Sequence, residues 1–141
     1  MDDLFFNQDH IMIQDMVREF AESEIMPIAR ELDEEEKFPT ELVKQMGELG
    51  LMGINVPEKY GGTDMSYRLS LECVSIISAA CASTGIIYAT TFHGIKPLID
   101  FGTEEQKERL LPRVAKGGLA SLAITEPSAG SDATGMLTRF T

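Results

Sequence analysis

The hydrophobic positions of the chain follow the period of an amphipathic helix in several segments. In the first segment, apolar residues recur every third or fourth position from Ile13 onward, and polar residues occupy the other face. Pro27 lies inside this run. Because proline lacks an amide hydrogen and crowds the preceding turn, we expect the helix to kink near Met26. The apolar face comprises Ile13, Met16, Val17, Phe20, Ala21, Ile25, Ile28 and Leu32.

The next two helices are bounded by turn-forming residues. Thr40 is placed to cap a short helix, and Gly50 is suited to end it. The sequence Tyr60-Gly61-Gly62 then predicts a loop. A third helix is predicted from about Tyr67 to Ala82, with one face formed by Leu69, Cys73, Val74, Ile77 and Cys81.

Two further helices complete the helical part. Ser83 or Thr84 can cap a fourth helix that runs to Phe101 and is apolar on nearly every face, so we expect it to be central. His93 on this helix is expected to be a packed or capped residue. The sequence Thr103-Glu104-Glu105-Gln106 is a capping box, in which hydroxyl and amide side chains satisfy free backbone amides at the start of a fifth helix.

The composition changes near Lys116 to Gly118, from long helices to small and turn-forming residues. Residues 119–125 (LASLAIT) are bounded by glycines and a proline, which favours the first strand of a sheet. A single strand has no neighbour to satisfy its backbone groups. The predicted fold is therefore mainly α, with an all-α domain over residues 1–117 and an incomplete β-domain over 118–141.

Charge and cysteine content narrow the classes of partner. The formal net charge of -11 disfavours nucleic acid, and we expect no membrane span, no secretory signal and a soluble, cytoplasmic protein. Cys73 and Cys81 would lie about 12 Å apart along one helix, too far for a disulfide. The acidic run from Glu31 to Glu36 could bind a metal or a partner, but we interpret it as a solvated helix end. No metal site is predicted.

The segment most suggestive of chemistry leaves the predicted strand and enters a loop of small side chains, residues 124–133 (ITEPSAGSDA). Small residues let main-chain amides approach a flat or phosphorylated ligand closely. Hydroxyls on Thr125, Ser128 and Ser131 can donate hydrogen bonds to such a ligand. On composition alone, an ordinary strand-to-loop turn remains the alternative. We interpret Glu126 and Asp132 as structural residues.

The order of residues in this loop resembles the TEPxAGSDA signature of acyl-CoA dehydrogenases. Five other segments are similar to motifs of the same family and occur in the family's order: 17–21 (VREFA), Phe38-Pro39, 47–51 (GELGL), 56–62 (VPEKYGG) and 101–107 (FGTEEQK). The resemblance covers nearly the whole chain. It implies a subunit of three parts: a helical amino-terminal domain, a middle β-domain and a carboxy-terminal helical bundle, assembled as a homo-oligomer.

The resemblance also implies a cofactor and its contacts. FAD would lie along residues 122–131, with Leu122, Ile124 and Thr125 beside the isoalloxazine ring. Gly130 and Ser131 would lie towards the pyrophosphate, with Ser131 also contacting the acyl-CoA substrate. Thr84, Tyr88 and Phe92 would line the far end of the acyl pocket, where their bulk indicates a limited chain length; simple core packing is the alternative for each.

The implied reaction is α,β-dehydrogenation of an acyl-CoA thioester, in fatty acid or amino acid catabolism. A glutamate base removes the α-proton while hydride passes to flavin N5, and electron-transfer flavoprotein or a similar acceptor reoxidises the flavin. No catalytic residue is predicted in this chain, because the base belongs to the carboxy-terminal bundle; the chain is interpreted as truncated after the signature. The alternatives are a non-catalytic helical interaction module and a related flavin monooxygenase. A processed eukaryotic protein of this family would lie in the mitochondrial matrix.

Overall fold

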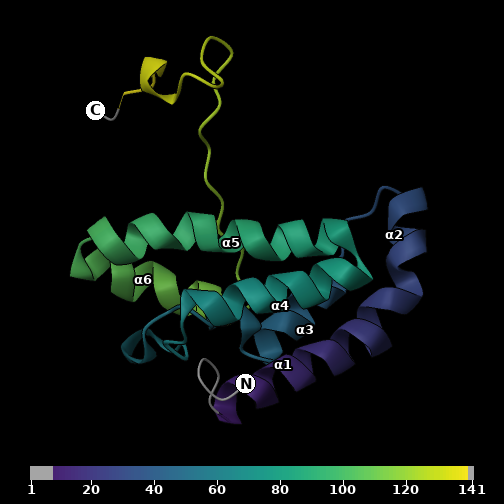
Figure 1. The fold of residues 1–141 in the computed structure, drawn as a ribbon. Helices are drawn as coiled ribbons and strands as arrows, with labels where there is room; N and C mark the ends of the chain where they lie inside the picture. The colour runs from purple at the N-terminus through teal and green to yellow at the C-terminus, as the bar shows by residue number, and fades with distance from the viewer. Residues whose placement is uncertain (1–7, 140–141) are drawn as a thin grey trace.

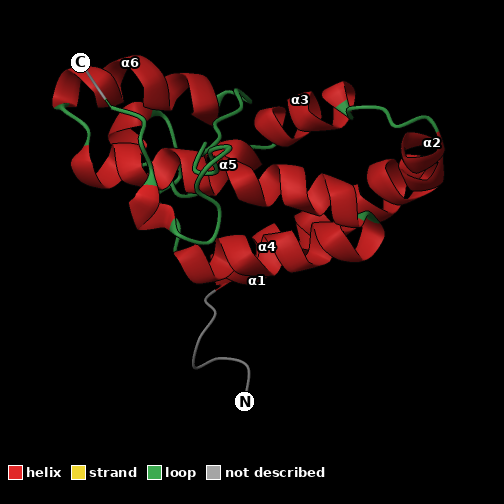
Figure 2. Ribbon diagram, turned by 90° about the horizontal axis from the view of Figure 1, so that it is seen from above, coloured by secondary structure: helices red, strands yellow, loops and turns green. Residues whose placement is uncertain are grey.

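The apolar faces predicted from the sequence pack against one another in layers of helices. The computed structural model describes residues 8–139, and α4 packs against both α1 and α5 (Figure 1). The fold class is confirmed as mainly α, because helices and loops account for the whole described range (Figure 2). The α-helices are α1 (Gln8–Phe20), α2 (Ala29–Glu34), α3 (Thr40–Glu48), α4 (Tyr67–Ala80), α5 (Ala82–Phe101) and α6 (Glu104–Ala115).

The predicted break at Pro27 is confirmed. The chain leaves α1 through a π-helical turn, Ala21–Ile25, and a 3-10 turn, Met26–Ile28, before α2 begins. Because Pro27 cannot donate a backbone hydrogen bond, the regular α-helical ladder cannot continue through it. The wider π-helical turn before Pro27 and the tighter 3-10 turn that contains it change the direction of the chain, so that α2 departs from the direction of α1 (Figure 1).

Two of the helix ends predicted from the sequence are confirmed: the start of α6 and the end of α3. Both hydrogen bonds of the capping box between Thr103 and Gln106 are present, and Gly50 has a left-handed conformation with φ of 76° beyond α3. Thr40 is the first residue of α3 and makes no side-chain cap, since Pro39 precedes the helix instead. A cap that the sequence analysis missed is Ser66, whose hydroxyl accepts a hydrogen bond from the Leu69 amide.

The start of α5 corrects a second capping prediction. Ser83 and Thr84 lie inside the first turn of the helix, and neither precedes it. Cys81 adopts an extended backbone between α4 and α5 and serves as the boundary of both. The turn from α4 into α5 is therefore made by one extended residue rather than by a capped loop.

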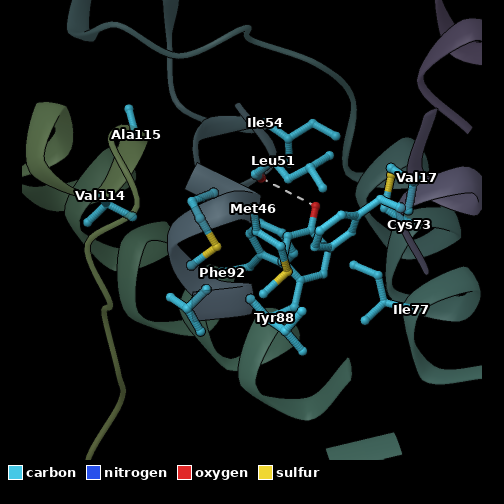
Figure 3. Packing of buried hydrophobic residues seen from close by; sticks show 14 of the residues in the cluster. Val17, Met46, Leu51, Ile54, Cys73, Ile77, Tyr88, Phe92, Val114 and Ala115 are labelled. Atoms are coloured by element: carbon cyan, nitrogen blue, oxygen red, sulfur yellow. Dashed lines mark hydrogen bonds between the residues drawn. The ribbon is translucent and has the colours of Figure 1, made fainter. Parts of the chain in front are cut away.

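The hydrophobic core lies where α4 and α5 meet α1, α3 and the segment after α3 (Figure 3). Tyr88 and Ile95 of α5 are fully buried, which confirms that this helix is central on one face. Its other face carries Ile86, which is 64% exposed, and Phe101, which is 86% exposed. Other fully buried core residues are Val17, Met46, Met52, Leu69, Cys73, Ile77 and Leu111.

The strand predicted over residues 119–125 is not formed within the described part of the chain. These residues run as extended but irregular chain, and a single bridge joins Glu126 to Ala129 further on. The physical reason is the absence of a neighbouring strand within residues 8–139, because a lone strand leaves its amides and carbonyls unpaired. The last long helix of the described residues, α6, ends at Ala115, and a domain boundary near Lys116 to Gly118 stays a prediction.

Candidate functional site

The extended segment after α6 crosses α5 at Gly94. A Cβ atom built on Gly94 would lie 2.6 Å from the backbone nitrogen of Ser121 and 2.7 Å from Ala120. Only a glycine leaves room for a backbone this close to a helix. Gly94 therefore fixes where the segment that carries the candidate cofactor residues passes over the central helix.

An open groove of about 340 Å³ lies at this crossing. Thr90 and His93 of α5 line one side, and Ser121, Leu122 and Ile124 line the other. Leu122 is 50% exposed and Ile124 is 41% exposed, so both present apolar surface. His93 was expected to be packed or capped; it is exposed, so packing in the core was wrong, and a capping role stays a prediction. The crossing of the later segment places it at a groove instead.

Beyond the groove, the chain extends away from the helices and folds into a closed loop (Figure 1). At its base, the amide of Glu126 donates to the carbonyl of Ala129 (3.0 Å), and the amide of Ala129 donates back to the carbonyl of Glu126 (3.2 Å). Thr125 precedes this turn, and Gly130 and Ser131 follow it, all exposed. The turn therefore keeps these three candidate cofactor residues within one short loop, whereas Leu122 and Ile124 lie before the loop, in the wall of the groove.

The carboxylate of Glu126 joins the two ends of this loop. Its two oxygens accept hydrogen bonds from the amides of Leu137 and Thr138, each 2.8 Å long. Hydrogen bonds from Thr138 and from the Leu137 amide lower the pKa of Glu126 below its ordinary value, because they stabilise the charged carboxylate. Further along the loop, the hydroxyl of Thr134 lies 2.7 Å from a carboxylate oxygen of Asp132.

The three residues assigned to the acyl pocket lie on the inward face of α5. Thr84 and Tyr88 are fully buried, and Phe92 is nearly so. The ring of Tyr88 packs edge-on against Phe92 with 4.8 Å between centroids. These side chains therefore pack in the core, away from the groove at Thr90 and His93. Their contact with an acyl chain stays a prediction.

The described residues show no cluster of three or more histidine, cysteine or acidic side chains able to hold a metal ion. Cys73 and Cys81 are both buried free thiols, and their staying reduced in solution remains a prediction. Within residues 8–139, no helix is both long enough and apolar enough to cross a membrane.

The helical layers are those of a known family. The model of the acyl-CoA dehydrogenase N-terminal domain matches residues 7–118. The chain belongs to the acyl-CoA dehydrogenase family. The family assignment made from the signature and its companion motifs is thereby confirmed.

Individual relatives agree with this assignment. The chain is 48% identical over 133 residues to the probable acyl-CoA dehydrogenase YngJ of Bacillus subtilis (strain 168). This alignment covers 91% of this chain and 34% of the relative. A solved acyl-CoA dehydrogenase complexed with FAD from Bacillus anthracis matches with a TM-score of 0.87 at 36% identity, over 96% of this chain and 24% of that chain. Butyryl-CoA dehydrogenase from Megasphaera elsdenii gives a TM-score of 0.89 at 28% identity, over 96% and 37%. The chain spans about a third of the length of the curated relatives that it matches.

Sequence reasoning missed three features of the site. Thr90 and His93 were not assigned to it, because only the path of residues 120–124 shows which face of α5 the groove uses. Gly94 carried a usable signal, since a glycine in the middle of a helix costs stability and indicates a packing reason such as a close backbone approach. The clamp made by Glu126 joins residues eleven and twelve positions apart, and no sequence pattern indicated it.

Proposed function

We propose that this chain forms the helical amino-terminal domain and the first cofactor-contacting segment of an FAD-dependent acyl-CoA dehydrogenase. The complete enzyme would remove a proton from the α-carbon and a hydride from the β-carbon of an acyl-CoA thioester. The observation that carries the proposal is the signature segment at residues 124–133, which begins at Ile124 in the wall of an open groove on the central helix. The solved relative from Bacillus anthracis, which is complexed with FAD, supports the choice of cofactor.

The groove residues suit one side of a flavin site. Leu122 and Ile124 present apolar side chains that would lie against the isoalloxazine ring and exclude water. The exposed hydroxyl of Thr125 would donate a hydrogen bond where a reduced flavin gathers negative charge. FAD, when bound, supplies the acceptor for the hydride. Gly130 and Ser131 would approach the pyrophosphate, and Ser131 would also contact the substrate.

The remaining parts of the reaction lie outside this chain in our proposal. The curated relatives are about three times as long as the matched region, and the general base is assigned to that further length. The acyl-CoA, an acceptor such as electron-transfer flavoprotein, and assembly into a homo-oligomer are likewise proposed for the complete subunit. The exposed Ile86 and Phe101 on α5 are apolar surface available for packing against it. We place the domain boundary at Lys116 to Gly118.

The test is to express the complete coding sequence that contains this chain. We expect a yellow protein with one FAD per subunit that reduces an artificial dye only when acyl-CoA is added. Thr125→Val should lower the rate of dye reduction, because it removes the hydroxyl donor beside the ring, whereas Thr40→Val, at an exposed position outside the loop and the groove, serves as the matched control. The 141-residue chain alone should bind FAD weakly or not at all.

Two results would overturn the proposal. A complete protein that stays colourless after refolding with excess FAD would exclude the flavin site. A colourless but monodisperse helical protein that captures a protein partner would favour a non-catalytic interaction module.

A further inference from the structure

The signature loop is closed by one side chain. Glu126 occupies the start of the loop, and its carboxylate binds the amides of Leu137 and Thr138 where the chain returns. Each oxygen takes a separate amide at 2.8 Å, so the carboxylate binds both donors at once. The side chain that begins the loop is therefore also the one that closes it.

The charge makes this contact stronger than an ordinary loop hydrogen bond. A backbone amide that donates to an ionised carboxylate forms a shorter and stronger bond than one that donates to a neutral acceptor. The lowered pKa of Glu126 is consistent with this, because those amides favour the charged form. Within residues 8–139 no sheet holds this segment, so the clamp and the turn from Glu126 to Ala129 supply much of its local order.

We propose that Glu126 is a positioning residue that fixes the shape of the cofactor-contacting loop by clamping the amides of Leu137 and Thr138. This inference rests on the proposed function. Thr125 directly precedes the clamp, and Ser131 lies between its two ends. The clamp therefore sets the spacing and direction of the two hydroxyls that the flavin and the thioester would meet, although Glu126 itself contacts neither.

The clamp is tested first in the 141-residue chain by nuclear magnetic resonance. The amide protons of Leu137 and Thr138 should move together with pH, with one midpoint below the ordinary pKa of glutamate. In Glu126→Gln this common titration should disappear and both amides should exchange faster with solvent. Glu108→Gln, on the exposed face of α6, is the matched control and should leave both amides unchanged.

Unchanged far-UV circular dichroism would show that both variants keep the helices, which lie apart from the loop (Figure 1). Amides of Leu137 and Thr138 that fail to titrate together in the wild type would overturn the clamp. So would exchange rates in Glu126→Gln that equal those of the wild type.

The consequence for the cofactor is tested in the complete subunit. Glu126→Gln should bind FAD about tenfold more weakly or worse, and should shift the flavin absorption bands, because the loop that meets the ring is no longer held. Glu108→Gln should match the wild type. Equal FAD affinity and equal spectra in the two variants would overturn the positioning role. A wild-type subunit that binds no FAD would instead overturn the proposed function, and the resonance result on the clamp would still stand.

Discussion

The hydroxyl of Tyr88 donates a hydrogen bond to the backbone carbonyl of Leu51 over 3.3 Å, joining the middle of α5 to the turn that follows α3 (Figure 3). Tyr88 is fully buried, so neither group can turn to water instead. Burial strongly raises the pKa of Tyr88 above its ordinary value, because the charged form would be desolvated. The hydroxyl therefore stays neutral and available as a donor at any ordinary pH.

We expect Tyr88→Phe to lower the free energy of unfolding by about 0.5–1.5 kcal/mol, because it removes a buried hydrogen bond to the carbonyl of Leu51, which keeps only the amide of Ile54 as a donor. Urea unfolding followed by circular dichroism measures the change. Tyr67→Phe is the matched control, since the ring of Tyr67 is 41% exposed and its loss of a hydroxyl should change stability little. If the two variants lose stability equally, the bond to Leu51 contributes nothing specific.

The Gly94 crossing predicts a large effect from a small substitution. Gly94→Ala places a methyl group 2.6 Å from the backbone nitrogen of Ser121, closer than two such atoms approach in proteins. Because the clash is with backbone, the segment after α6 must move away from α5. We expect little change in helicity but faster amide exchange at Ala120 and Ser121, and weaker FAD binding in the complete subunit.

The control for this substitution is Gly130→Ala, where a Cβ atom meets nothing within 4 Å. Its amide exchange at residues 120–121 should equal that of the wild type. Gly94→Ala would contradict the packing argument if those amides exchanged at the wild-type rate.

The helices could be predicted from the sequence because their signals are local. The apolar period, the proline break at Pro27 and the reciprocal pair Thr103 and Gln106 each involve residues within a turn or two of one another. The caps predicted at Thr40 and at Ser83 or Thr84 were wrong, because α3 begins at Thr40 itself after Pro39, and α5 begins before Ser83, directly after Cys81. Which residue precedes the first helical one depends on how the chain before it packs.

The candidate site could be predicted only in part. The signature loop stands out in the sequence because small residues and hydroxyls are concentrated there. The residues of α5 that line the groove, Thr90 and His93, could not be found, since they are set by the path of a segment about thirty residues later. The prediction of a strand at residues 119–125 was wrong for a related reason. A strand forms only by pairing with a neighbouring strand, and the pattern of residues within one segment does not show whether that neighbour is present.

The hydrogen bonds around Glu104 at the surface lead us to expect that the stability of the fold changes with pH in acid. Glu104 accepts hydrogen bonds from Lys59 (2.9 Å) and Tyr60 (2.8 Å), and these bonds, with a weaker one from Lys107, lower its pKa from 4.5 to about 2. A carboxylate with a depressed pKa stabilises the folded state above its unfolded pKa, and this contribution is lost as the pH falls towards the folded value. We therefore expect Glu104→Gln to be less stable than the wild type at neutral pH, with the difference shrinking below about pH 4.5.

Urea midpoints measured at neutral pH and at about pH 3 give the comparison. The effect is small, because Glu104 and Lys59 are largely exposed and water screens them. Glu108→Gln should show no such dependence. A stability difference between Glu104→Gln and the wild type that stays constant with pH would contradict the proposed role of the charge.

The two thiols are predicted to differ in reactivity. Burial raises the pKa of Cys73 to about 11, so its thiolate is scarce at neutral pH. Burial alone would also raise the pKa of Cys81, but hydrogen bonds from Ser83 and from the backbone at Thr84 outweigh it and lower the pKa below its ordinary value. Because the thiolate is the reactive form and Cys81, at the junction of α4 and α5, is 9% exposed, iodoacetamide should modify Cys81 first.

Peptide mass spectrometry over time measures this order. Cys81→Ser should abolish the early modification while the native protein persists, and Cys73 should react only in denaturant; equal rates at the two thiols in native protein would contradict the assignment.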